Sequence, residues 1–269
     1  MKYIIPSLAV MALVPFLLFS SVAALEMPRA LGIIENVVLT TLFPASVLSR
    51  LVAFSFIGEC VAKFLSKTFM WKAVGLQEKY IPAVVAGLIC GFPTGAIILR
   101  DIKGENREKA LALSSVPSLA FLCRVLGTQK GIVLFTAFVG VLFVFSHFIP
   151  SKKENSDTSC FEKMNFVRAL SSGIESAVAM SGAIIFFVTL LSFVPESTPT
   201  LIKEICYAVC EIGAGASISS HPLTLALSLS FGGLSVLSQI SFMSGGVRLR
   251  YYLISRIFLF FVAVLILCK

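Results

Sequence analysis

Uncharged stretches of about 20 residues or longer recur along this 269-residue chain. They cover Tyr3 to Leu25, Tyr80 to Leu99, Gly131 to Ser151, Ser176 to Pro195 and Ile212 to Val247. A helix of about 20 apolar residues crosses the roughly 30 Å hydrocarbon core of a bilayer, and the last stretch is long enough for two such helices. The sequence therefore predicts an all-α, polytopic helical membrane protein, multi-pass in the cell membrane, with the lipid bilayer as its solvent.

Composition supports this class and argues against others. Hydrophobic residues make up 57% of the chain and charged residues only 13%, whereas soluble domains carry about 25% charged residues. The apolar stretches lack the alternation of an outer-membrane barrel. The net charge of +8 comes from short loops at the ends of the stretches, where lipid headgroups explain it better than nucleic acid. The seven cysteines have no metal or disulfide spacing, so we predict no metal and no cofactor.

Polar segments divide the chain. We predict an N-terminal transmembrane helix over 1–30, a first gate-like half over 31–150, a polar connecting loop over 151–167 and a second gate-like half over 168–269. Ser21-Val22-Ala23 resembles a signal-peptide cleavage site, but the apolar run before it is longer than the usual signal, which favours a retained span.

In the first half, two apolar segments are interrupted. Gly91-Phe92-Pro93-Thr94-Gly95 breaks the first, and Ser114-Ser115-Val116-Pro117 lies within the second. Proline removes a backbone donor and glycine permits irregular dihedral angles, so each helix is expected to break. The polar turn between them predicts a broken helical hairpin.

The second half repeats this arrangement. Glu211-Ile212-Gly213-Ala214-Gly215 forms one polar, glycine-rich interruption, and Phe231-Gly232-Gly233-Leu234-Ser235 forms another, followed by Gln239. Each half is therefore predicted to hold a broken hairpin flanked by spanning helices. The pattern leaves open whether the two halves are inverted relative to each other.

Paired, interrupted apolar segments indicate the binding site of a secondary transporter. Irregular backbone within a membrane needs protein or a water-filled cavity to satisfy its polar groups, and exposed helix N-termini there can bind anions. We expect the two hairpins to meet around a small polar or anionic solute that moves by alternating access. The candidate solute-binding residues are Gly91, Phe92, Pro93, Thr94, Gly95, Ser114, Ser115, Pro117, Gly213, Gly215, Gly232, Gly233, Ser235 and Gln239.

Several of these residues have a purely structural alternative. Gly91 and Gly95 have the spacing that packs two helices closely. Ser114 and Ser115 can bond the backbone of their own helix, and Gln239 can bond a neighbouring helix.

Charged residues within apolar segments are candidates for function by default, because they are costly in a bilayer. Glu211 lies at a helix break and is the candidate for coupling to a proton or cation, or for a structural clamp. Arg50 and Glu59 lie about 180° apart on a helix, so they cannot pair with each other, and each is expected to lie near an interface or to need a partner elsewhere.

The interruptions also carry a family resemblance. Gly91 to Ala96, Ser114 to Pro117, and Phe231 to Val236 with Gln239 resemble motifs of YlbJ-type sporulation integral membrane proteins, within the nucleoside-recognition (gate-domain) superfamily. The resemblance covers roughly residues 40 to 266, although the family usually has asparagines and a glycine before the later proline, where this chain has Ser114, Ser115 and Val116. It implies transport in endospore formation, with dipicolinate as the solute and the forespore membrane as the location.

Three alternatives stay open. A nucleoside-type small-solute transporter belongs to the same class. A non-transporting membrane scaffold in spore assembly belongs to another class and would tolerate changes at Glu211 and Gly233. An enzyme is not expected, because no catalytic motif is present and Asp101 and Asp157 both lie in polar loops. A homo-oligomer is compatible with each of these interpretations.

Overall fold

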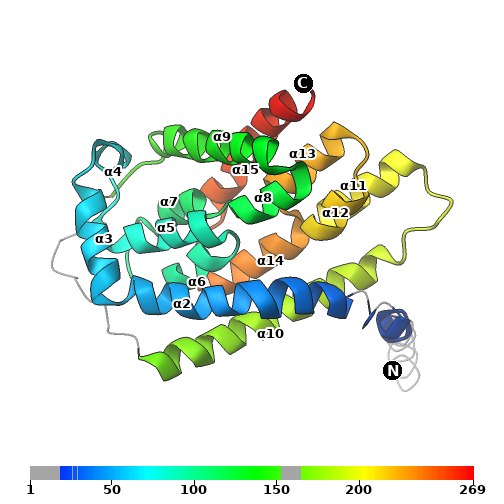
Figure 1. Ribbon diagram of the computed structural model, residues 1–269, viewed down its shortest axis with the longest axis horizontal. Helices are drawn as coiled ribbons and strands as arrows, with labels where there is room; N and C mark the ends of the chain where they lie inside the picture. The colour runs from blue at the N-terminus through cyan, green and yellow to red at the C-terminus, as the bar shows by residue number, and fades with distance from the viewer. Residues whose placement is uncertain (1–18, 26, 29, 153–164) are drawn as a thin grey trace, which may run out of the picture.

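The computed structural model describes residues 19–25, 27–28, 30–152 and 165–269, and all regular structure in these ranges is helical (Figure 1). Most of the predicted N-terminal span over 1–30, and residues 153–164 of the predicted connecting loop, lie outside the described residues. From residue 34 onward the elements are the π-helix η1 (Ile34–Leu42), α2 (Phe43–Ala53), α3 (Phe56–Ser66), α4 (Phe69–Val74), the 3-10 turn η2 (Glu78–Tyr80), α5 (Ile81–Cys90), α6 (Thr94–Arg100), α7 (Arg107–Ser114), α8 (Leu119–Leu126), α9 (Thr128–Ser146), α10 (Phe166–Leu191), α11 (Thr200–Cys210), α12 (Ile212–Ile218), α13 (Pro222–Phe231), α14 (Gly233–Met243) and α15 (Arg250–Leu267).

Six helical stretches of the described chain are long and apolar enough to cross a membrane. Their outward faces carry large exposed apolar side chains, such as Val178 and Phe186 on α10 and Phe261 on α15. These features confirm the all-helical class and indicate a multi-pass membrane protein. The six stretches are Ala30–Ala53, Arg107–Leu126, Thr128–Ser146, Phe166–Leu191, Pro222–Met243 and Arg250–Leu267.

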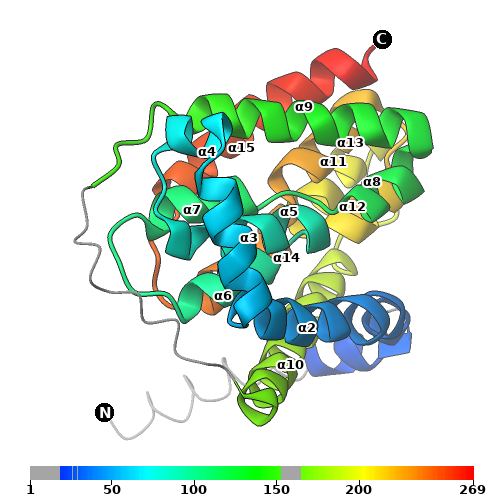
Figure 2. The ribbon, with the colours of Figure 1, turned by 60° about the vertical axis from the view of Figure 1, so that its left-hand side comes forward.

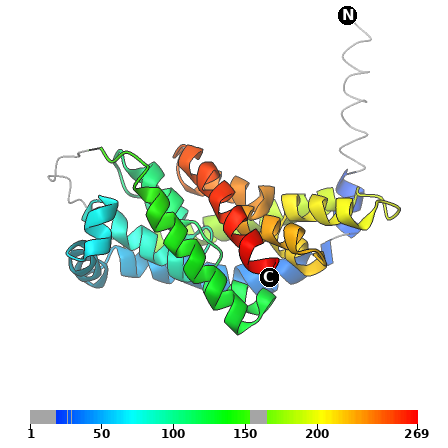
Figure 3. The same ribbon diagram turned by 90° about the horizontal axis from the view of Figure 1, so that it is seen from above.

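The helices form three layers (Figures 1 and 2). On one side α2 lies along α10, so closely that a Cβ on Gly173 would meet the Val47 side chain. On the opposite side α9 and α15 run beside each other (Figure 3). The shorter, interrupted helices fill the space between, and one hydrophobic core with Phe138, Met180 and Leu259 joins the layers.

The middle layer contains four interrupted helices. The breaks separate α5 from α6, α7 from α8, α11 from α12 and α13 from α14, at the four positions that the sequence predicts. Glycine is required where the chain turns at Gly232 and Gly233, because their φ angles of 75° and 77° lie in the left-handed region. Two of these interrupted pairs, α7 with α8 and α13 with α14, are among the six long apolar stretches, and α5 with α6 and α11 with α12 are not.

Two arginines, one fully buried and one half-buried, bind carbonyls at the C-terminal ends of these short helices. Arg50, fully buried, donates to the Ile97 carbonyl of α6 at 3.0 Å and pairs with Asp101 at 3.1 Å. Of the two alternatives for Arg50, an interfacial position or a partner elsewhere, the structure shows the partner. Arg107 donates to Leu99 at the end of α6 and to Ser244 at the end of α14. Helix C-termini present unpaired carbonyls and partial negative charge, so these cations stabilise ends that lipid would leave unsatisfied.

Candidate functional site

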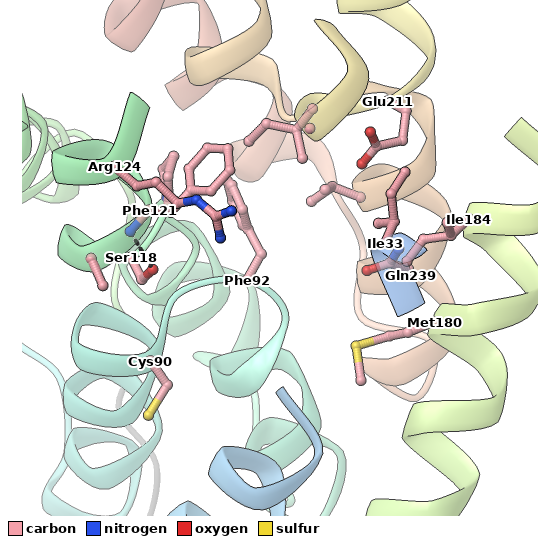
Figure 4. A pocket seen from close by; sticks show the side chains of 15 residues that line it. Ile33, Cys90, Phe92, Ser118, Phe121, Arg124, Met180, Ile184, Glu211 and Gln239 are labelled. Atoms are coloured by element: carbon pink, nitrogen blue, oxygen red, sulfur yellow. Dashed lines mark hydrogen bonds between the residues drawn. The ribbon is translucent and has the colours of Figure 1, made fainter. Parts of the chain in front are cut away.

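A cavity of about 240 Å³ lies where the four helix breaks converge. Each of the four interrupted helix pairs, α5–α6, α7–α8, α11–α12 and α13–α14, contributes residues to its wall. Ile33 and helix α10 close one side (Figure 4). The lining residues are Ile33, Cys90, Phe92, Pro117, Ser118, Ala120, Phe121, Arg124, Met180, Ile184, Glu211, Ile212, Gly213, Val236 and Gln239.

The break between α5 and α6 directly contacts the break between α7 and α8. The Phe92 N–H donates to the Val116 carbonyl at 3.1 Å, which joins the α5–α6 break to the α7–α8 break. A Cβ on Gly91 would lie 2.5 Å from the Ser118 nitrogen, so only glycine permits this approach. The two irregular segments thus satisfy part of each other's backbone.

The break between α11 and α12 likewise crosses the break between α13 and α14 in close contact. A Cβ on Gly233 would lie 3.0 Å from the backbone of Cys210 and Glu211, so the α13–α14 break packs against the α11–α12 break. The two crossings then meet, because a Cβ on Gly232 would lie 3.4 Å from the Phe92 ring. This contact places both crossings beside one cavity.

The polar lining combines a cation, a carboxylate and an amide. Figure 4 shows Arg124 reaching in from one side and Glu211 lying on the opposite side. Glu211 is only 5% exposed and accepts from the Ala214 N–H, which caps α12. Gln239 donates to Ser235 at 3.2 Å, and Ser118 accepts from the Phe121 N–H. Arg124 has no hydrogen-bond or ion-pair partner within the described chain, so its guanidinium is available to a ligand.

The structure separates the predicted site residues into two groups. Phe92, Pro117, Glu211, Gly213 and Gln239 line the cavity. The others form or pack the breaks outside the lining set: Gly91, Pro93, Thr94, Gly95, Ser114, Ser115, Gly215, Gly232, Gly233 and Ser235.

Ser114 and Gly95 illustrate the second group. Ser114 is 1% exposed and donates to the Leu111 carbonyl of its own helix. A Cβ on Gly95 would collide with the Ser114 side chain. In this structure Gly95 and Ser114 thus pack α6 closely against α7, and no space is left between the two helices at this point.

Arg124 is the main lining residue that sequence reasoning missed, because it directly follows an apolar stretch that ends at Cys123 and so resembles an ordinary flanking charge. A usable signal is present in the sequence. Pro117, Phe121 and Arg124 have the spacing i, i+4 and i+7, which places them on one face of a helix that begins at the predicted break. All three line the cavity.

A second buried carboxylate, Glu204 on α11, holds the start of α13 and lies outside the cavity lining. It accepts from the Ser220 hydroxyl and N–H, the His221 N–H and the Thr224 hydroxyl. These four hydrogen bonds satisfy the buried carboxylate. The carboxylate thus serves as a structural anchor.

Replacing Glu204 by glutamine is expected to lower the free energy of unfolding by about 1 to 3 kcal/mol, since several bonds to a charged acceptor are weakened. Thermal unfolding of the purified protein at neutral pH measures this effect. Equal melting temperatures for the two proteins at neutral pH would contradict the anchoring role.

Among the described residues, no three His, Cys, Asp or Glu side chains gather in a way that could hold a metal ion. The polar groups that line the cavity are a guanidinium, a carboxyl, an amide and a hydroxyl, and they lie between aromatic and aliphatic walls. Comparison of the chain with protein-family models, curated proteins and solved structures finds no match.

Proposed function

We propose that the protein transports a small polar or anionic solute across a membrane by alternating access. One observation carries this proposal: four helix breaks converge on a single cavity whose lining includes Arg124, Glu211 and Gln239. Interrupted helices are costly in a bilayer unless a protein cavity satisfies their backbone groups. Transporters use this arrangement to place a solute at helix ends near the middle of the membrane.

The movement that we propose takes place between two groups of helices, α5–α8 and α11–α14, as two related halves. Each group contains two interrupted passes that cross at their breaks. The groups meet at the contact of Phe92 with Gly232, beside the cavity. Rocking of one group against the other would open the cavity to alternate sides while the solute stays in place.

The lining favours an anion with an apolar or aromatic body. Arg124 supplies positive charge, and Phe92, Phe121 and Met180 supply apolar wall. Glu211 would repel an anion unless the carboxyl takes up a proton, which supports coupling of solute entry to a proton. Dipicolinate, the solute that the family resemblance implies, is a planar aromatic dicarboxylate of this class, and the same resemblance supports a role in sporulation. A nucleoside would depend on Gln239 and Ser118 rather than on Arg124.

The test is uptake by liposomes that contain the purified full-length protein. Dipicolinate, simple carboxylates and nucleosides are compared with and without a proton gradient, and we expect anion uptake that the gradient accelerates. Arg124→Gln is expected to reduce this uptake by about tenfold or more, since a charge-assisted contact is worth at least about 1.4 kcal/mol.

Arg248→Gln is the matched control, because Arg248 is exposed and lies outside the cavity lining. It should leave uptake unchanged. Absence of uptake for every solute would overturn the transport proposal and favour the membrane scaffold.

A further inference from the structure

Arg256 on α15 is a fully buried cation that the proposed mechanism has not used. Its Nη1 donates to the Ser230 carbonyl at 3.4 Å, in the last turn of α13. Its Nε and Nη2 have no hydrogen-bond partner within the described chain. The guanidinium carbon lies 4.5 Å from the centre of the Tyr252 ring and 5.7 Å from that of Phe92.

Arg50 provides the comparison. It is equally buried, and its Nε and Nη1 also lack hydrogen-bond partners within the described chain, but it forms an ion pair with Asp101 and a hydrogen bond to Ile97. No carboxylate of the described residues forms an ion pair with Arg256. A buried cation without a counter-charge costs several kcal/mol, and two aromatic rings and one carbonyl offset only part of this. Such a residue in a membrane segment is a candidate for function.

The unpartnered atoms have a specific shape. Nε–H and Nη2–H form one edge of the planar guanidinium, and this edge matches the two oxygens of a carboxylate or phosphate. The nitrogen that donates to the Ser230 carbonyl is Nη1, which lies outside that edge. The free part of Arg256 is therefore the part that binds an oxyanion through two parallel hydrogen bonds.

Phe92 links Arg256 to the cavity. Its ring contacts the Arg256 guanidinium and also lines the cavity. It follows Gly91, whose φ of 78° belongs to the helix break, and a Cβ on Gly232 would lie 3.4 Å from it. The ring thus stands at the junction of the two hairpin crossings, next to both the cation and the solute space.

We propose that Arg256 is a second anion-binding residue of this cavity, screened by the Phe92 ring in the structure described, and that it binds a carboxylate or phosphate group when the ring turns aside. The proposal rests on the proposed function of the same cavity. The Phe92 ring would then expose Arg256 in only part of the transport cycle. Anion affinity is then reduced by the fraction of molecules in which the ring covers Arg256.

The first test uses phenylglyoxal, which modifies arginine, on the full-length protein in lipid nanodiscs, with peptide mass spectrometry to locate the product. Removing the ring with Phe92→Ala should increase the labelling rate of Arg256 by about tenfold or more, because a screened group reacts in proportion to its exposed population. Arg50 is the internal control and should stay unlabelled. Benzoate or inorganic phosphate should slow the labelling of Arg256.

Two results would overturn the proposal. If Arg256 stays as unreactive as Arg50 in Phe92→Ala, the ring does not screen it. If both arginines become reactive together, the ring supports the packing of the whole region.

The second test uses Arg256→Met with Phe92 intact. Replacing an unpaired buried cation by an apolar residue of similar length should preserve or raise the melting temperature, while the shift in melting temperature caused by benzoate or phosphate disappears. A large loss of stability with an unchanged anion shift would assign Arg256 a structural role. If anions protect Arg256 but no solute crosses the membrane, transport fails and the anion site stands.

Discussion

Glu211→Gln is expected to abolish the proton dependence of solute uptake and to reduce uptake by about a hundredfold, within the usual range of coupling between two ligands. The glutamine oxygen can still accept from the Ala214 N–H, so the cap of α12 is retained. What is lost is the ability to take up and release a proton beside the solute. Uptake into liposomes with and without a proton gradient measures this directly.

Glu204→Gln is the matched control for this prediction. Glu204 lies within α11 and Glu211 lies directly after it, and both side chains are at least nine-tenths buried. Glu204 has four protein donors and lies outside the cavity lining. Its variant should lose stability but keep the response to the gradient, and Glu211→Gln should show the reverse. A gradient response that survives in Glu211→Gln would remove Glu211 from the coupling step.

Gly233→Ala is expected to lower the free energy of unfolding by about 2 to 4 kcal/mol. Alanine at a φ of 77° costs about 1 to 2 kcal/mol by itself. The new Cβ would also lie 3.0 Å from the backbone of Cys210 and Glu211, which cannot move aside without shifting the α11–α12 break. Thermal or denaturant unfolding in detergent checks the stability, and uptake should fall with it because the cavity wall is displaced.

Two other glycines separate the effect of the backbone angle from the effect of the close contact. Gly246 has a φ of 79°, and a Cβ added there would have no atom within 4 Å, so Gly246→Ala tests the backbone angle alone. Gly140 lies within α9 with open space around it, so Gly140→Ala should be neutral or stabilising by up to about 1 kcal/mol. If Gly233→Ala is no more destabilising than Gly246→Ala, the two breaks do not depend on their close contact.

The helix breaks could be predicted from the sequence because their causes are local. Glycine and proline act on the backbone of their own segment, so Pro93 and Gly232 mark interruptions without knowledge of the neighbours. Glu211 is identifiable for the same reason, as a single ionisable residue at one of these breaks.

The composition of the cavity wall could not be predicted in the same way. It depends on which segments cross, and Met180 and Arg124 belong to helices whose position only the packed structure reveals. Ser114 and Gly95 are predicted to contact solute because they flank breaks, yet the close approach of α6 and α7 uses them for packing. The need of Arg50 for a partner follows from its charge, but the identity of Asp101 follows only from the fold.

The bridge formed by Arg107 has a mechanical consequence. One guanidinium holds the ends of α6 and α14 together through the carbonyls of Leu99 and Ser244, and these helices belong to different hairpin groups. Separating α6 from α14 would break at least one of these two hydrogen bonds, at a cost of about 1.5 to 3 kcal/mol because the donor is charged. If the two groups move relative to each other as proposed, a movement that preserves both bonds is a rotation about this point. Arg107 would then be its pivot, and the displacement would grow with distance from it.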